Sequence, residues 1–585
     1  DISKLKTVPQ NSEIVFENDL FITKPLCFSG LCKVRFRAMQ NVGIYGGIKL
    51  GTPSPDRYCG DDCVSYELPQ DLCEINPRDF FVCGERAQAV RFPKEGIFYA
   101  KGTEFPDTTK MDNHSSYFIA YKEDLGEINP CGATVNFFHY WIDEHITVGG
   151  YEPQSGKITL NSLTTMTVGT ARKPENCATL KYYFTGISGV PLNEGEWAYD
   201  KSAGKIYYKP KSGQDLLKGA FLPIADRIFD FKNCKNVTLS GLKLAYTDSR
   251  YQNRKEWVAG DEQYDLKDRS YGGDPQSCCF MHGAINFNGC AECRVLGCEI
   301  YSVGTHGISV ETACNNITVQ NCRIYDTGGG AVRIYGGTLK QDKSLITQNI
   351  TVKNNDFSLG GRIYGAAVGI LCSHASYVNI IGNRIHGYYY SGISCGWVWG
   401  YFASATHHCK ISRNEIFDIG GGMLSDMGGI NTLGPQEGTI ISHNRIHNIK
   451  ASFYGDWGIY LDEGSSGIKV FKNTVSDTGT ESFMLHYGKN NRVFNNRFYG
   501  ENGMLTIENK EEHVGVIIYN NLFYTDGNAV WGKNSQFASA VSYRNKIYSN
   551  ENSAVYIDPE GKEYSLAEFT EKTGLEKDSR FCRGK

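Results

Sequence analysis

The second half of the chain repeats one short pattern of apolar and polar positions. From about residue 235 a β-branched strand is followed by a polar pair and then by an alternating apolar and aromatic stretch, as in VQNCRIYD, IIGNRIHG and VFNNRFYG. The second residue of the polar pair recurs about every 23–33 residues. It is Cys298, Cys322, Asn355, Asn383, Asn414, Asn444, Asn473, Asn496, Asn521 and Asn545. Short strands separated by turn residues predict the coils of a solenoid.

A basic coil of about 23 residues, lengthened by insertions, is typical of a right-handed parallel β-helix. One coil cannot bury its inward residues alone, so coils stack about 4.8 Å apart and close the backbone ladders and the core together. Equivalent residues should then stack, with asparagines in a left-handed bend bonding to one another in a ladder. Insertions should collect on one face and form the binding groove.

The pattern predicts an all-β protein with four parts. Residues 1–50 are expected to form an N-terminal cap and the first β-helix coils. Residues 51–225 hold alternating runs such as ATVNFFHYWIDEHITV and TLKYYFTGI, which predict an inserted antiparallel β-sandwich or barrel. Residues 226–560 form the β-helix with the catalytic groove. Residues 561–585 form a capping tail, with a short amphipathic helix over 564–576.

Composition narrows the function. The chain has 585 residues, 41% of them hydrophobic, with 60 basic against 64 acidic residues. That balance leaves no excess of positive charge to bind nucleic acid. The chain has no run of about 20 apolar residues, so no membrane-spanning helix is predicted. No phosphate-binding glycine loop and no GxSxG elbow occur, so no cofactor is predicted. We expect a monomer that is secreted, periplasmic or held at the cell surface, with its signal peptide already removed from a chain that starts at Asp1.

Twenty cysteines allow three interpretations. The closely spaced Cys59, Cys63, Cys73 and Cys83 favour disulfides in an exported protein. Cys290-x-x-Cys293 has zinc-ligand spacing, but no second close pair completes the set, so no metal site is predicted. Cys298 and Cys322 share one slot of the repeat, which favours buried thiols that serve as small apolar side chains.

The longest coils, from Cys322 to Asn473, contain the densest group of aromatic residues in the chain. They are Tyr388, Tyr389, Tyr390, Trp397, Trp399, Tyr401, Tyr454 and Trp457. Flat rings stack on the apolar faces of sugars, so this group suggests a carbohydrate platform; alternatively, the rings only cover one another. The predicted sugar-binding residues are Tyr390, Trp397, Trp399, Trp457, Tyr460 and His486.

Three acidic phrases lie in the same zone, and they contain Asp426, Asp456, and Asp462 with Glu463. Glycoside cleavage needs two carboxyl groups a few ångströms apart, one protonated and one ionised. Alternatively, an aspartate in a glycine-rich turn caps backbone N–H groups. These four acids are the predicted catalytic residues, and His486 should lie near Asp462 on the following coil.

The spacing of Asp426 and Asp462 within their coils differs by six residues. A straight strand at about 3.3 Å per residue would separate them by roughly 20 Å. The glycine stretches at 420–422 and 428–429 must therefore bend to bring them together. If they do not, Asp456 is the expected partner of one of the two.

The chain resembles β-helical glycoside hydrolases with an inserted β-sandwich, namely families 120 and 141. The resemblance covers nearly the whole chain. It is carried in the insert by DFFVCGERAQAVRFP (79–93) and GEWAYDKSAGKIYYKP (195–210). In the repeat region it is carried by LSDMGGINTLG (424–434), GDWGIYLDEGSSG (455–467) and HYGKNNRVFNN (486–496).

The resemblance implies roles for two positions. The family 120 nucleophile lies in a GIWLD-like strand that matches residues 458–462. The glutamate that serves as acid and base in family 120 is missing from the matching stretch 482–486. The resemblance to family 141 instead implies two catalytic aspartates about 40 residues apart. Asp426 and Asp462 fit this spacing better than the family 120 pattern. That family includes an α-L-fucosidase acting on pectin and a xylanase.

The predicted function is hydrolysis of glycosidic bonds in a plant cell-wall polysaccharide or oligosaccharide, either xylan or a pectin-type glycan. Two alternatives stay open. A polysaccharide lyase on the same fold would need a Lys or Arg base beside calcium. A non-catalytic carbohydrate-binding β-helix protein would keep its binding when both aspartates are replaced.

Overall fold

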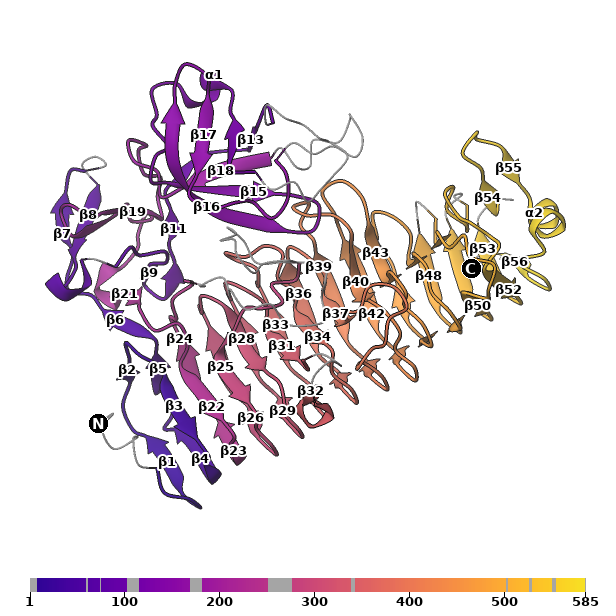
Figure 1. Cartoon of the computed structure of the whole chain (residues 1–585), viewed down its shortest axis with the longest axis horizontal. Helices are drawn as coiled ribbons and strands as arrows, with labels where there is room; N and C mark the ends of the chain where they lie inside the picture. The colour runs from indigo at the N-terminus through magenta and orange to yellow at the C-terminus, as the bar shows by residue number, and fades with distance from the viewer. Residues whose placement is uncertain are drawn as a thin grey trace.

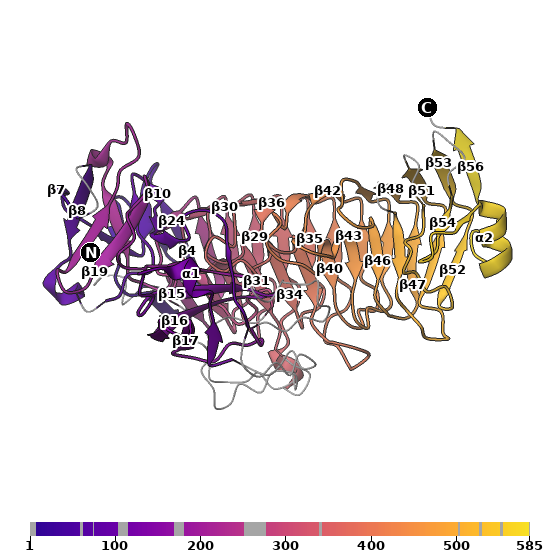
Figure 2. The same cartoon turned by 90° about the horizontal axis from the view of Figure 1, so that it is seen from above.

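Three long parallel sheets form a β-helix in the computed structural model, which describes residues 8–58, 62–73, 75–102, 115–168, 181–250, 276–337, 342–500, 503–525, 529–549 and 554–583. The elongated solenoid is seen in Figure 1 and, from above, in Figure 2. The all-β parallel β-helix predicted from the repeat is confirmed. Within the described part of the chain, no helix has the length and apolar character needed to cross a bilayer.

The first sheet contains, in spatial order, β1 (Glu13–Phe16), β4 (Cys32–Ala38), β23 (Lys235–Ser240), β26 (Arg294–Leu296), β29 (Thr318–Gln320), β32 (Thr351–Lys353), β35 (Asn379–Ile381), β38 (Lys410–Ser412), β41 (Ile440–Ser442), β44 (Lys469–Phe471), β47 (Asn491–Phe494), β50 (Val516–Tyr519) and β52 (Ala540–Tyr543).

The second sheet contains β2 (Leu20–Phe21), β5 (Gly43–Tyr45), β24 (Lys243–Ala245), β27 (Glu299–Tyr301), β30 (Arg323–Tyr325), β33 (Asp356–Ser358), β36 (Arg384–Tyr388), β39 (Glu415–Ile419), β42 (Arg445–Ile449), β45 (Thr474–Val475), β48 (Arg497–Gly500), β51 (Leu522–Thr525), β53 (Lys546–Ser549) and β56 (Arg580–Arg583).

The third sheet carries most of the candidate site. It contains β3 (Leu26–Ser29), β22 (Phe229–Lys232), β25 (Gly283–Asn288), β28 (His306–Val310), β31 (Val332–Tyr335), β34 (Ile370–Ser373), β37 (Ile393–Gly396), β40 (Met427–Thr432), β43 (Asp456–Leu461), β46 (Phe483–Leu485) and β49 (Leu505–Ile507).

A segment of mostly antiparallel strands interrupts the solenoid after its first coil. It follows β5, and after it the chain returns to the solenoid at β22, which pairs with β3. Its strands are β6 (Gly47–Lys49), β7 (Ser54–Asp56), β8 (Cys63–Glu67), β9 (Phe81–Val82), β10 (Glu85–Arg86), β11 (Gln88–Ala89), β12 (Arg91–Phe92), β13 (Phe98–Tyr99), β14 (Tyr117–Ile119), β15 (Thr134–Phe138), β16 (Asp143–Glu152), β17 (Lys157–Leu160), β18 (Lys181–Thr185), β19 (Glu196–Asp200), β20 (Lys205–Tyr208) and β21 (Ala220–Pro223). We call this segment the insert; the short helices α1 (Lys122–Leu125), η2 (Gln70–Leu72) and η4 (Leu216–Lys218) belong to it.

The chain ends beyond the last coils. The hairpin β54 (Tyr556–Ile557) and β55 (Glu563–Tyr564) precedes α2 (Leu566–Thr573), whose N-terminus has a Ser565–Glu568 capping box. This helix lies within the predicted range 564–576. After it, β56 returns to the second sheet and pairs with β53, so the tail also extends the solenoid.

Equivalent residues stack as the repeat predicts. Val295, Val319 and Val352 are in register on neighbouring strands and have no exposed surface or almost none. Aromatic residues on the outer face stack too: the rings of Phe494 and Tyr519 lie 5.1 Å apart and nearly parallel. Alternation along each strand decides which side chain faces inward, so one pattern builds every coil.

The predicted asparagine ladder is present and buried. The Oδ1 atom of Asn444 accepts hydrogen bonds from the backbone N (3.0 Å) and the Nδ2 (3.0 Å) of Asn414. The same pair of bonds links successive asparagines from Asn355 to Asn545. The ladder thus satisfies backbone and amide groups that burial would otherwise leave unpaired.

One detail of the predicted bend is wrong. The left-handed residue is the one before the ladder asparagine, as with Arg413 (φ 56°), His443 (φ 58°) and Lys472 (φ 55°). The amide of the ladder asparagine points inward and bonds to the equivalent asparagine of the next coil. The exposed residue before it therefore adopts the left-handed conformation.

We expect Asn444→Ala to lower the free energy of unfolding by about 2–5 kcal/mol, because it leaves several buried donors and acceptors without partners. Urea denaturation followed by circular dichroism measures the change. The matched control is His443→Asn, which replaces the neighbouring exposed residue with one that also tolerates the left-handed conformation. It should change the free energy of unfolding by less than about 0.5 kcal/mol. Equal effects of the two changes would contradict the role given to the ladder.

Candidate active site

Asp462 lies at the end of β43, where the apolar strand leaves the third sheet. Leu461 before it faces the core, and parallel pairing aligns Leu461 with Leu485 and then with Ile507 on the next coils. The residue after each of these is therefore brought to one outer position on three successive coils. Asp462, His486 and Glu508 occupy this column.

One oxygen of the Asp462 carboxylate has three hydrogen-bond donors around it. Its Oδ1 accepts hydrogen bonds from Tyr460 OH (2.8 Å) and Glu463 N (2.8 Å), and it lies 3.1 Å from His486 Nδ1. Its Oδ2 makes no hydrogen bond within the described residues. The three donors all act on one oxygen and leave the other oxygen available for chemistry.

His486 supplies positive charge to this carboxylate. Burial opposes the charge, but the hydrogen bond and attraction to Asp462, with added attraction to Glu463 and Glu508, raise the pKa of His486 to about 9. The side chain of His486 is 36% exposed, whereas that of Asp462 is 11% exposed. The pair therefore has an imidazolium at the surface over a mostly covered carboxylate at neutral pH.

Asp426 lies just before β40, in a backbone conformation that the surroundings must hold. Its φ of 60° is left-handed for a residue with a side chain. Its N donates to Tyr454 O (3.0 Å), and its O accepts from Tyr390 OH (2.9 Å). Gln276 Nε2 in turn donates to Tyr390 OH at 2.7 Å.

The insert also contacts this turn. Ser425 N donates to the carbonyl of Tyr140 at 2.6 Å, and the rings of Tyr140 and Tyr454 meet edge to face. Nearby, Lys181 Nζ donates to Ser452 Oγ at 2.6 Å. Figure 1 shows β15 and β16 of the insert reaching toward this part of the solenoid. The insert thus helps position the backbone that carries Asp426.

Tyr460 joins the two aspartates. Its hydroxyl lies 2.8 Å from Asp462 Oδ1 and 3.3 Å from Asp426 Oδ1, so these two oxygens are at most about 6 Å apart, a spacing suited to two acting carboxyl groups. The predicted bend is present at Gly420, Gly421 and Gly422, which all have positive φ. It is absent at 428–429, because these two glycines lie inside the extended strand β40. Burial, and then the carboxylates of Asp426 and Asp462, raise the pKa of Tyr460 well above its ordinary value, so it keeps its proton.

The other two predicted acids are held by different partners. Asp456 Oδ2 accepts from Ala451 N (3.0 Å) and packs against Gly479. This is the capping role considered as the alternative, so Asp456 does not join the pair. Glu463 Oε2 accepts from Tyr487 OH (2.8 Å).

Most of the predicted sugar-binding aromatic residues are buried beside the site and do not line an exposed surface. Tyr390 and Trp397 are buried, and Trp397 Nε1 donates to Ser394 Oγ (3.2 Å). Trp457 is also buried, with its ring 4.3 Å from that of Tyr460 and its Nε1 bonded to Glu481 Oε2. Trp399, which meets the Trp397 ring edge to face, is partly exposed. Tyr390 and Trp397 are thus covered by neighbouring side chains, as are Trp457 and Tyr460.

Three groups near the site escaped the sequence prediction. Glu508 stands in the column of Asp462 and His486 and is exposed, and its side chain makes no hydrogen bond within the described residues. Desolvation by its neighbours raises its pKa. Tyr487 holds Glu463, and Glu481 holds Trp457. The available signal was the shared ending of GIYLD, SFMLH and MLTIE, in which an apolar residue precedes a titratable one.

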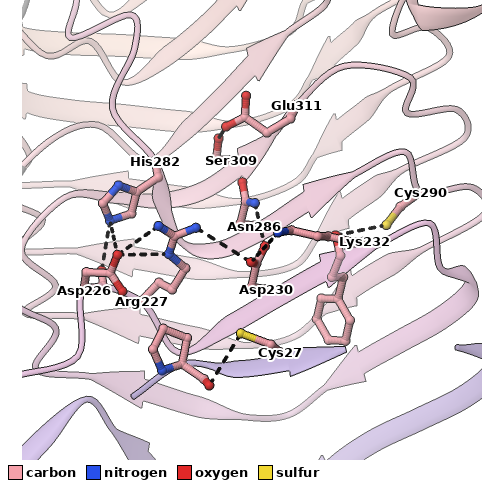
Figure 3. A network of polar contacts seen from close by, with 12 residues as sticks. Cys27, Asp226, Arg227, Asp230, Lys232, His282, Asn286, Cys290, Ser309 and Glu311 are labelled. Atoms are coloured by element: carbon pink, nitrogen blue, oxygen red, sulfur yellow. Dashed lines mark hydrogen bonds and ion pairs between the residues drawn. The ribbon is translucent and has the colours of Figure 1, made fainter. Parts of the chain in front are cut away.

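A second polar cluster on the same sheet differs in its charge balance (Figure 3). Arg227 pairs with Asp226 (2.9 Å), and Asn286 Nδ2 donates to Asp230 Oδ1 (2.8 Å). His282 Nε2 lies 3.1 Å from Asp226 O, and burial lowers the pKa of His282 to about 4, so it is neutral. This cluster is charge-compensated, whereas several carboxylates gather around one imidazolium at Asp462.

The cysteines separate into two groups. Cys63 is disulfide-bonded, but Cys73 and Cys83 are thiols, so the disulfide prediction is wrong for those two; Cys59 lies outside the described residues. Cys290 and Cys293 are buried thiols that donate to backbone carbonyls, as are Cys298 and Cys322.

Comparisons with known proteins agree with this architecture. A family model described as right handed beta helix region matches residues 283–426 and 397–570. A solved structure named "Glycoside hydrolase" has a TM-score of 0.63 and 17% identity, covering 86% of this chain and 89% of its own. XylC in complex with xylose has a TM-score of 0.50 and 12% identity, covering 93% and 82%. No curated protein matches the chain. At these identities the similarity establishes the fold.

The raised pKa of His486 gives a pH-dependent contribution to stability. Because the folded pKa of about 9 exceeds the ordinary value of about 6.5, the contribution is complete below about pH 6.5 and is lost as the pH rises through about 9. The stability difference between the wild type and His486→Gln, measured by urea denaturation from pH 6 to 10, should shrink over this window. Asp462→Asn should lower the pKa of His486 in an NMR titration. A His486 pKa near 6.5 in the wild type would refute the ion pair.

Proposed function

We propose that the protein is a glycoside hydrolase in which Asp426 and Asp462 are the two catalytic carboxyl groups. The observation that carries the proposal is the Tyr460 hydroxyl, which lies within 3.3 Å of both carboxylates. Two carboxyl groups on separate coils, joined in this way beside partly exposed aromatic residues, match the needs of glycosidic cleavage. Structural similarity to a protein named "Glycoside hydrolase" supports the same reaction class.

Asp462 is the nucleophile in this proposal. The Tyr460, Glu463 and His486 donors all act on Oδ1, so Oδ2 is the oxygen free to attack the anomeric carbon. The His486 imidazolium lies 3.1 Å from Oδ1 and offsets the charge of the carboxylate. A nucleophilic carboxylate leads through a glycosyl–enzyme intermediate to retention of configuration.

Asp426 is the acid and base. One hydroxyl has one proton, which Tyr460 donates to Asp462 over the shorter distance. The contact between Tyr460 and Asp426 therefore needs a second proton. Asp426 supplies it when its carboxyl group is protonated and donates to the Tyr460 oxygen. It would then protonate the leaving oxygen and afterwards take a proton from water. A separation of at most about 6 Å is nearer the ~5–5.5 Å of retaining enzymes than the ~6.5–9.5 Å of inverting ones.

We propose a family 141-type enzyme acting on xylan or a pectin-type glycan, exported from the cell and active as a monomer. The segments 424–434 and 455–467, which carry the resemblance to that family, are the two that the structure brings together at Tyr460. XylC, whose structure contains xylose, has a similar fold.

Replacing either carboxyl group should abolish hydrolysis. We expect Asp426→Asn and Asp462→Asn each to lower kcat/KM by roughly 10³-fold or more on the aryl glycoside or wall polysaccharide that a substrate screen identifies. The matched control is Asp456→Asn, on the same strand as Tyr460, which should stay within a few-fold of the wild type. Product anomers followed by NMR should show retention.

Other outcomes separate the alternatives. Loss of activity in Asp456→Asn but not in Asp426→Asn would select the other acid pair. Loss in Glu508→Gln but not in Asp426→Asn would move the acid role to Glu508. Unsaturated products would indicate a lyase, and unchanged glycan binding by both Asn variants with no reducing ends from the wild type would indicate a binding protein.

Tyr460→Phe tests the connection between the carboxyl groups. Removal of the hydroxyl should lower kcat by about 10²-fold with a smaller change in KM, because the lost hydrogen bonds act on the reacting groups. It should also move the acidic limb of the pH profile of kcat/KM, a readout that a packing role would not change. The control is Tyr487→Phe, which loses a bond to Glu463 only. Equal pH profiles for the wild type and Tyr460→Phe would refute the bridging role.

A further inference from the structure

Three buried cysteines from two sheets converge inside the solenoid at the level of β34 and β37. Cys372 and Cys395 are in register on these two strands, and Cys409 precedes β38 of the first sheet. The three sulfur atoms all lie within 4.8 Å of one another. All three side chains are buried, at 2% exposure or less. Elsewhere in these columns the positions hold Ile334 and Val378, which are ordinary core residues.

A buried amide oxygen lies beside one of the three cysteines. Gln436 is fully buried, and its Oε1 lies 3.5 Å from Cys395 Sγ. Its Nε2 donates to the carbonyls of Cys395 (2.8 Å) and Leu433 (3.3 Å). Those two bonds fix the amide so that its oxygen faces Cys395 Sγ.

The spacing suits a tetrahedral zinc ion. With Zn–S bonds of about 2.3 Å and a Zn–O bond of about 2.1 Å, the edges of a tetrahedral site are about 3.6–3.8 Å. The observed 3.5 Å from sulfur to oxygen already has this length. The sulfur atoms, which lie within 4.8 Å of one another, must approach by at most about 1 Å.

We propose that Cys372, Cys395 and Cys409, with Gln436 Oε1 as the fourth ligand, form a closed structural site for Zn²⁺. Three thiolates leave Zn²⁺ with one net negative charge, whereas Cu⁺ would leave two, so the buried site favours the divalent ion. Binding replaces the three thiol protons, which are released to solvent. Because the site lies in the core, zinc enters while the chain folds.

The pair Cys290 and Cys293, which has zinc-ligand spacing in the sequence, differs from the three convergent cysteines. The thiols of this pair donate to the carbonyls of Asn288 (3.4 Å) and Ala291 (3.3 Å). No other described group of three such residues has its ligand atoms this close together.

The test measures metal bound to the full-length protein. We expect protein refolded with Zn²⁺ under reducing conditions, then dialysed against EDTA, to retain about one zinc per chain by mass spectrometry of metals. Protein refolded with Co²⁺ should show thiolate-to-cobalt charge-transfer absorption. Cys395→Ala should lose both signals, and the control Cys290→Ala should keep them.

Wild-type protein that refolds without retaining zinc and without cobalt–thiolate absorption would overturn the proposal and leave the cysteines as core packing. This result does not depend on whether Cys395→Ala folds. It is also independent of the proposed hydrolase, because Asp426→Asn and Asp462→Asn should bind zinc as the wild type does.

Discussion

The pairing of each coil with the next, through parallel backbone ladders and the buried asparagine ladder, is the constraint on which the molecule depends. It sets the register of the third sheet from β3 to β49 and therefore decides which residues meet across coils. Asp462, His486 and Glu508 are far apart in sequence but share one column because Leu461, Leu485 and Ile507 are in register. The catalytic proposal is thus a consequence of stacking.

The rest of the proposed site is built by departures from the regular coil. Asp426 precedes its strand in a left-handed turn, and bonds from Tyr390, Tyr454 and the insert hold that turn. Such a conformation costs about 1–3 kcal/mol and persists only where the surroundings determine it. The insert therefore contributes to the proposed site through the backbone of Ser425.

The interior shows a comparable distinction between regular and exceptional positions. Most buried cysteines replace small apolar residues and donate to nearby carbonyls. Cys372, Cys395 and Cys409 differ because residues from two sheets bring their three sulfur atoms close together, with Gln436 beside Cys395. Identical residue types thus have different chemistry according to what faces them.

The sequence by itself determined the β-helix, the asparagine ladder, and Asp426, Asp462 and His486 as the residues to consider. Each follows from a local pattern repeated in every coil or from the order of residues along one strand. Only the tertiary structure decided that Tyr460 joins the two aspartates, that Asp456 turns to Ala451, and that Tyr390 and Trp397 are covered. These outcomes depend on the paths of long loops and on contacts with the insert, which no periodic pattern encodes.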